Sequence, residues 1–234
     1  MEERRASERE RPHLQLRETF GHVVIDEAQD LSPMQWRMIG RRIPSRSMTI
    51  LGDLGQATSA WAADDWADAL EHLGRNVSVE RRDLTINYRT PAEIMDAASD
   101  LLGDVNPNLA RPRSVRSAGR PPLEMTVPAD VLVNTVVEHV RQLRLEAEEE
   151  GGGTVCVVAP EPYLEALRSE LGTTDGAQVL EAEVAVLDVT KVKGLEFDSV
   201  VIADRRAILR DQGPRALYVA MTRPTQHLTM IDVA

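Results

Sequence analysis

Short apolar runs alternate with longer amphipathic stretches along most of this 234-residue chain. Short runs that end in glycine or an acid are typical of buried strands, whereas apolar positions three and four apart indicate helices. These runs predict strands within residues 23–25, 47–53, 77–89, 154–160, 184–190, 199–204 and 227–233. The amphipathic stretches predict helices within residues 33–39, 66–73, 91–103, 130–150, 162–171 and 216–224. Residues 106–122, rich in Pro, Arg and Ser, are expected to be irregular.

This alternation of strands and helices predicts an α/β fold with a mostly parallel sheet. In such sheets ligands bind at the carboxyl ends of the strands. The polar or flexible residues that follow the apolar runs, and are therefore expected at those ends, are Asp26, Glu27, Gly52, Asp53, Thr190 and Lys191. This placement is what a nucleotide site requires.

Composition limits the range of functions. The net charge is -11, and a protein that binds nucleic acid through non-specific phosphate contacts usually carries a basic surface. Any nucleic-acid contact must therefore come from a local patch. No apolar run approaches the ~20 residues that a membrane helix needs. The single cysteine, Cys156, lies in an apolar run, so we expect a buried core thiol and, by default, a reducing cytoplasm.

The strongest local motif is VVIDEAQD, which places Asp26 and Glu27 after a strand. One carboxylate of such a pair can hold Mg²⁺ while the other orients water. We assign the metal role to Asp26 and the role of base to Glu27. The alternative for the two acids alone is a solvated acidic turn, because short motifs match by chance.

A second motif, LGDLGQATSAW, contains Gln56 and Trp61. The Gln56 amide can hydrogen-bond a terminal phosphate or the attacking water, and Trp61 can stack on a nucleobase. The alternative for Trp61 is a core residue on a helix.

The remaining motifs supply cationic and flexible residues. Arg89 in INYRTP can contact phosphate in a fork, or form an ordinary surface salt bridge. In VTKVKGLEFD, Gly194 lets the backbone approach a ligand closely, and Glu196 can accept a hydrogen bond from a ribose hydroxyl. Arg223 in ALYVAMTRP is a candidate arginine finger.

The order of these motifs resembles motifs II to VI of the UvrD/Rep superfamily 1 helicases, over about residues 15–234. The resemblance implies RecA-like folds, with ATP and Mg²⁺ as ligands. It implies catalytic roles for Glu27, Gln56, Arg89 and Arg223 and a metal role for Asp26. It further places Tyr88, Gly194 and Glu196 at the nucleotide, and Trp61 and Thr190 at single-stranded DNA.

The chain departs from the family pattern in two ways. The sequence contains no G-x-x-x-x-G-K-[ST] loop, which normally cradles the phosphates. It also has room for only about a hundred residues between Arg89 and Lys193, where these helicases carry a large inserted subdomain. The stretches DLSPMQWRM, NYRTPAEIM and RPRSVRSAGRPP are more similar to HelD-type factors, a resemblance that implies RNA polymerase as a partner.

We therefore expect an incomplete first RecA-like domain over residues 1–85 and a complete second one over residues 86–234. In this interpretation the chain is the C-terminal part of an ATP-dependent motor, completed by a missing N-terminal half or a complementing chain, and inactive alone. The alternative is a non-catalytic module that binds RNA polymerase or another protein. An acidic α/β domain without a nucleotide role would require the ordered motifs to be a coincidence.

The missing loop also predicts a difference in stability. The strand that precedes such a loop occupies the middle of the first sheet, so we expect the strands at Val23 and Ile50 to lack a partner. Residues 1–85 should then be less protected from hydrogen exchange than residues 125–234.

Overall fold

The computed structural model describes residues 19–74, 78–105, 109, 111–149, 151–173 and 182–234. Its internal contacts divide the chain into two compact units, Met1–Glu80 and Arg81–Ala234. We call them unit 1 and unit 2 and describe each by itself.

Unit 1 is built on two short parallel strands, β1 (Val23–Ile25) and β2 (Met48–Ile50). The expectation that these strands lack a partner is wrong, because β1 and β2 pair with each other in register. Hydrogen bonds extend the pairing beyond the strands, since Leu51 N donates to Ile25 O at 2.8 Å and Ala28 N donates to Leu51 O at 3.0 Å. The carboxyl ends of the two strands therefore lie together.

The helices of unit 1 follow their predicted signals. They are α2 (Pro33–Arg42) and α3 (Trp66–Glu71), with 3-10 turns η1 (Ala28–Asp30) and η2 (Leu54–Gln56). Ser32 caps α2 in a reciprocal capping box with Gln35. The core of the unit centres on buried apolar side chains at Ile25, Ala28, Trp36, Ala69 and Leu73.

Unit 2 contains a five-stranded, fully parallel sheet in the order β5-β9-β8-β6-β7. Its strands are β5 (Leu123–Val127), β6 (Val155–Val158), β7 (Val184–Leu187), β8 (Phe197–Ala203) and β9 (Pro224–Val233). A separate parallel pair joins β3 (Ile86–Asn87) to β4 (Arg113–Ser114). The α-helices are α4 (Ala92–Val105), α5 (Leu132–Glu149), α6 (Glu161–Leu171), α7 (Arg205–Gln212) and α8 (Pro214–Met221), and two 3-10 turns are η3 (Ala129–Val131) and η5 (Val189–Lys191).

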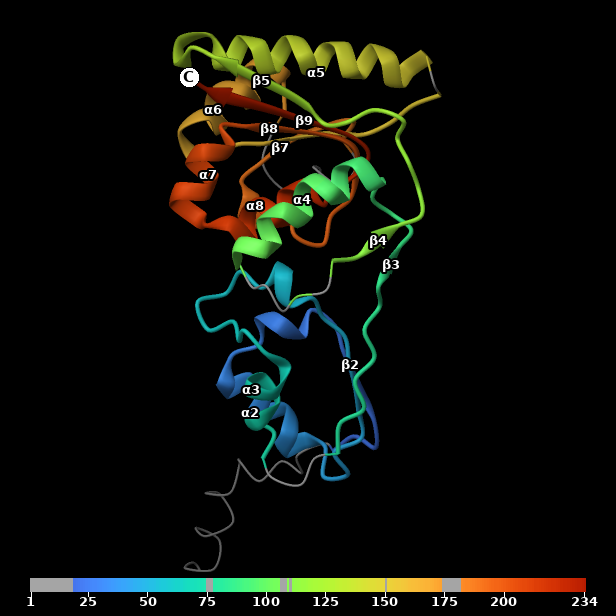
Figure 1. Ribbon diagram of the computed structural model, residues 1–234. Helices are drawn as coiled ribbons and strands as arrows, with labels where there is room; N and C mark the ends of the chain where they lie inside the picture. Colours follow the sequence, from blue (N-terminus) through green and yellow to red (C-terminus); the bar gives the residue numbers. More distant parts are fainter. Residues whose placement is uncertain (1–18, 75–77, 106–108, 110, 150, 174–181) are drawn as a thin grey trace, which may run out of the picture. The chain divides into compact units, whose positions relative to one another are not determined.

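Helices cover both faces of this sheet (Figure 1). Alternate residues along each strand point to opposite faces. In β6, Cys156 and Val158 pack with α4 and α8, whereas Val155 and Val157 pack with α5 and α6. Two apolar layers result, one on each side of the sheet, and the predicted α/β parallel fold flanked by helices is confirmed.

Some sequence expectations are corrected by this fold. The stretch expected to be irregular contains β4, and neither β5 nor α7 was predicted. In α7 the sequence RRAILRDQ has few apolar residues, so its periodicity is weak, although Asp204 caps it by accepting from Ala207 N. Cys156 is buried as predicted, and this burial raises the pKa of its thiol. None of the described helices is long and apolar enough to cross a membrane.

Candidate nucleotide site residues in two units

The acidic residues of unit 1 lie directly beyond the paired strands, as predicted. Asp26 and Glu27 follow β1, and both are exposed. Glu27 adopts the left-handed region with φ 51°, and its N–H donates to Asp26 Oδ1 at 2.8 Å. A non-glycine residue in this region costs energy and persists only where its surroundings hold it.

A buried amide connects Glu27 to the end of β2. The Gln29 side chain is only 3% exposed. Its Nε2 donates to Glu27 Oε2 at 2.5 Å, while its Oε1 accepts from Asp53 N at 3.1 Å. The sequence motif alone does not indicate this role for Gln29, because its partner Asp53, in the loop after β2, lies 24 residues away along the chain.

The same loop holds Gln56. Asp53 Oδ2 accepts from Gln56 Nε2 at 2.8 Å, and Asp53 Oδ1 accepts from Gly55 N at 2.8 Å. The structure therefore brings the predicted residues Glu27 and Gln56 into one hydrogen-bonded group through Gln29 and Asp53. We call these four side chains the unit 1 relay.

Trp61 is anchored beside this group. Its Nε1 donates to Asp30 O at 3.0 Å, and the Asp30 carboxylate accepts from Thr58 N and Ser59 N at 3.1 and 3.2 Å. The Trp61 side chain is nevertheless 55% exposed, so the alternative that it is a core residue is wrong. It borders a small pocket, whose other lining residues include Leu54 and His72.

In unit 2 the structure brings Arg89 and Glu196 together. Arg89 Nη2 and Glu196 Oε1 form an ion pair at 2.8 Å, with about half of each side chain exposed. The side-chain Oδ1 of Asn87 accepts from Arg89 N and Thr90 N, which fixes the turn after β3. Arg116 Nη1 donates to Arg89 O at 2.9 Å and holds the same turn from the other side.

Arg223 follows the C-terminal end of α8, and its side chain is buried. It is 3% exposed, and its guanidinium donates to Val219 O, to Leu195 O and to Thr222 Oγ1 at 3.0, 3.3 and 3.1 Å. A phosphate could reach this guanidinium only if some of these hydrogen bonds opened. Arg89 and Arg223 nonetheless contact neighbouring residues of one loop, Glu196 and Leu195.

The loop that carries these contacts follows β7. Gly194 has φ 77°, a conformation that favours glycine. Thr190 is exposed, and both its N–H and its hydroxyl donate to Asp188 Oδ1. Partial burial acts to raise the pKa of Asp188, but hydrogen bonds from Thr190 and Gln212 outweigh it and lower the pKa below its usual value.

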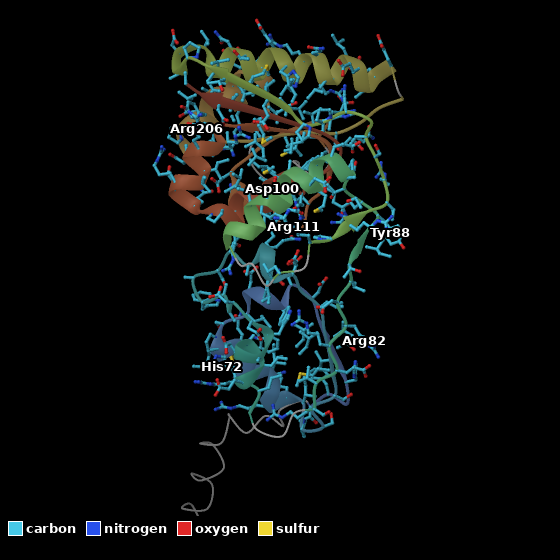
Figure 2. The ribbon with its side chains drawn as sticks, in the orientation of Figure 1. His72, Arg82, Tyr88, Asp100, Arg111 and Arg206 are labelled. Atoms are coloured by element: carbon cyan, nitrogen blue, oxygen red, sulfur yellow. The ribbon has the colours of Figure 1, made fainter. Side chains whose placement is uncertain are left out.

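Tyr88 projects from the end of β3 and is 69% exposed (Figure 2). Its ring is thus accessible for stacking, next in sequence to the Arg89 of the ion pair. Every site residue predicted from sequence lies in the described part of the chain. In unit 1 these residues follow β1 or β2, and in unit 2 all but Arg223 lie in the segments that follow β3 or β7. Arg223 lies between α8 and β9.

Comparison with protein families gives a match at each end of the chain. Residues 5–66 match the UvrD/REP helicase N-terminal domain, and residues 183–231 match the UvrD-like helicase C-terminal domain. Each unit therefore contains a stretch that is similar to a UvrD-type helicase domain. The first match contains the unit 1 relay, and the second contains Thr190, Gly194, Glu196 and Arg223.

Two curated proteins are similar to part of this chain. The RecBCD enzyme subunit RecB of Chlamydia pneumoniae is 29% identical over 101 residues, which is 42% of this chain and 10% of that protein. The RecB subunit of Mycobacterium tuberculosis strain CDC 1551 is 32% identical over 90 residues, which is 38% of this chain and 8% of that protein. The chain thus spans about a tenth of the length of these relatives.

Two solved structures are similar to this chain. One is the C-terminal domain of a possible DNA helicase from Lactobacillus plantarum, with a TM-score of 0.47 and 24% identity over 63% of this chain and 88% of that one. The other is the PRRSV helicase, with a TM-score of 0.48 and 17% identity over 89% of this chain and 34% of that one.

Proposed function

We propose that this chain is part of an ATP-dependent superfamily 1 helicase or translocase motor that acts on nucleic acid. The observation that carries the proposal is the unit 1 relay, which joins two motifs from different strands at the end of a parallel sheet. An acidic turn with no function needs no buried amide linking it to the next strand. The UvrD/Rep-like sequence at both ends of the chain supports the same conclusion.

In this proposal the residues of unit 1 prepare the water and the metal. Asp26 fits a Mg²⁺ ligand, because its carboxylate is exposed and nucleotide-bound Mg²⁺ usually takes only one or two protein carboxylates. When bound, Mg²⁺ would neutralise phosphate charge. Glu27 orients water as the base, and Gln56 senses the terminal phosphate. Trp61, which is exposed, would stack on a base of single-stranded DNA.

The residues of unit 2 are proposed to bind nucleotide from the second RecA-like domain. The accessible Tyr88 ring would stack on the base, and Arg89 would contact phosphate. Glu196 would accept from the ribose, with Gly194 permitting close approach. Arg223 would act as the second arginine once its hydrogen bonds open, and Thr190 would contact nucleic acid.

The domain limits of this motor are part of the proposal. Residues 1–85 would form a partial first RecA-like domain and residues 86–234 a complete second one. Because the sequence holds no phosphate-binding loop, the motor would need that loop from an N-terminal half or a complementing chain. Alone, the chain should bind Mg-ATP weakly and not hydrolyse it.

Calorimetric titration of the isolated chain with Mg-ATP tests the last statement. We expect weak or undetectable binding and no turnover, with wild type and Arg223→Ala alike. Turnover in the isolated chain that Glu27→Gln abolishes would contradict it.

A fusion tests the motor itself. The loop-bearing N-terminal segment of a UvrD/Rep-type helicase, joined ahead of this chain, should produce ATP hydrolysis that Glu27→Gln or Arg89→Ala reduces at least tenfold. Arg113→Ala, an exposed arginine on β4, is the matched control and should retain hydrolysis. A folded fusion that binds Mg-ATP and shows no dependence on Glu27 would refute the proposal.

A second candidate function is binding of RNA polymerase without catalysis. The net charge of -11 favours a protein partner over direct phosphate contacts, and Arg223 is engaged by its own unit. Purified RNA polymerase should then bind the isolated chain without nucleotide, and Glu27→Gln should leave this binding unchanged. Absence of binding at micromolar concentrations would dismiss this candidate.

A further inference from the structure

We infer that Gln29 is a positioning residue that fixes the Glu27 carboxylate and ties it to the loop that carries Gln56. The inference rests on the proposed function, in which Glu27 orients water and Gln56 senses phosphate. Gln29 itself is buried and so touches neither water nor phosphate in this role. It acts through the two residues that it connects.

The chemistry of the partners sets the orientation of the Gln29 amide. The Glu27 carboxylate can only accept a hydrogen bond, so the NH₂ group of Gln29 must face it. The Asp53 N–H can only donate, so the Gln29 carbonyl oxygen must face Asp53. A side chain at position 29 must therefore offer a donor and an acceptor at once, which Glu, Met and Leu cannot do with an ionised or apolar end.

Packing leaves this amide little freedom. A Cβ added at Gly52 would lie 2.5 Å from Gln29 Oε1 and 2.7 Å from a ring carbon of Trp66. The Gln29 and Trp66 side chains therefore occupy the space beside Gly52. The backbone of the loop after β2 passes close to the Gln29 amide. A buried amide that loses its hydrogen-bond partners raises the free energy of the folded state. If the segment after β1 or the loop after β2 moves, Gln29 and the other of these two segments should therefore move with it.

The relay thus makes the position of Glu27 depend on that of Gln56. Asp53 is the link, since its N–H binds Gln29 while its carboxylate accepts from the Gln56 amide. A shift of Gln56 on contact with a ligand would be transmitted to the base through three hydrogen bonds. This coupling requires no contact between Glu27 and Gln56 themselves.

Hydrogen exchange measured by NMR on the isolated chain tests each bond separately. Gln29→Met removes the acceptor and should speed exchange of the Asp53 N–H about tenfold, whereas Gln29→Glu retains an acceptor and should speed that exchange less than Gln29→Met does. Glu27→Ala, at an exposed position, should speed exchange of the Gln29 side-chain amide by a similar factor. Because Glu27→Ala leaves the core intact, this arm remains decisive even if the Gln29 variants do not fold.

Exchanging the carboxylate and the amide between positions 27 and 29 tests whether Glu27 and Gln29 act as a pair. Gln29→Glu places two carboxylates side by side and should lower the melting temperature, while the double variant Glu27→Gln with Gln29→Glu restores the bond in reverse and should recover most of the loss. Gln142 and Glu146 on α5 form an exposed pair of the same chemistry at 3.0 Å. Gln142→Glu is the matched control and should lower the melting temperature much less.

Two results would overturn the inference: unchanged exchange of the Gln29 amide in Glu27→Ala, or no recovery of stability in the double variant. None of these measurements uses nucleotide. Failure of the motor proposal in the ATP experiments would therefore leave them interpretable. Their own failure would remove the relay as support for the motor proposal, which the ATP experiments test independently.

Discussion

The two units are built from similar apolar runs, yet they bury their strands to different degrees. In unit 2, all four residues of β6 are buried, and β8 is buried along nearly its whole length. In unit 1, Val24 in the middle of β1 is 62% exposed, and Leu51 just after β2 is 45% exposed. Apolar runs in the sequence predict strands in both units, but burial depends on which other elements cover the sheet.

Coverage explains this difference. The sheet of unit 2 has α5 and α6 on one face and α4 and α8 on the other. In unit 1 the side chains of Val23, Ile25, Met48 and Ile50 face the core formed with Trp36, while Val24 and Thr49 on the other face are exposed. Parallel sheets in α/β proteins are normally covered on both faces, and the exposed face of unit 1 therefore supports the proposal that unit 1 is a partial domain.

The largest effect should come from the core of unit 2. Ile202→Ala removes a fully buried side chain from the middle of β8 and should lower the free energy of unfolding of unit 2 by about 2–5 kcal/mol. Val24→Ala in β1 is the control and should change stability by no more than about 0.5 kcal/mol, because Val24 is mostly exposed. Urea unfolding followed by circular dichroism measures both. Equal losses would mean that Val24 is covered in solution.

The strands of unit 2 show how far sequence can predict this fold. The runs around β6, β7, β8 and β9 are nearly all apolar, and each prediction is confirmed. Strand β5 was missed because Leu123, Met125 and Val127 alternate with polar residues over only five positions after two prolines. Its assignment needs pairing with β9, which lies about a hundred residues further along the chain.

A smaller loss should follow substitution at Gly52 in unit 1. In Gly52→Ala the new Cβ would press on Gln29 and Trp66, so we expect a loss of about 1–3 kcal/mol in the stability of unit 1. Gly21→Ala is the control, since a Cβ there meets nothing within 4 Å, and its effect should stay within about 0.5 kcal/mol. Thermal melts of both variants, read by Trp fluorescence, provide the comparison. A Gly52→Ala chain as stable as Gly21→Ala would show that the β2 loop yields readily.

Sequence predicted where the candidate site residues lie along the fold better than it predicted how their side chains connect. Asp26 and Glu27 directly follow β1 as expected, and Gln56 lies in the 3-10 turn η2 that follows β2. Neither the buried position of Gln29 nor the burial of Arg223 could be predicted, since each depends partly on a residue outside its motif, Asp53 for Gln29 and Leu195 for Arg223. Their environment comes from packing, which motif patterns do not encode.

The smallest expected effect concerns the stability of unit 2 at low pH. Hydrogen bonds from the Ser117 hydroxyl and from Ala118 N and Gly119 N lower the pKa of Glu93 to about 2. Its ordinary value is 4.5, so the contribution of the charged form to stability is complete above that pH and is lost as the pH falls toward 2.

NMR of the Ala118 N–H between pH 6 and pH 2 checks this. We expect the signal to shift only at the lower end of that range, and Glu93→Gln should remove the shift. A midpoint near 4.5 in the wild type would show that the three hydrogen bonds do not hold the carboxylate in solution.

Hydrogen exchange across the whole chain tests most directly the claim that unit 1 is a partial domain. Mass spectrometry of the exchanged chain should show the β1 and β2 amides exchanging much faster than those of β6, β8 and β9. Equal protection in the two units would contradict the account, because it would mean that the sheet of unit 1 is as well covered as that of unit 2.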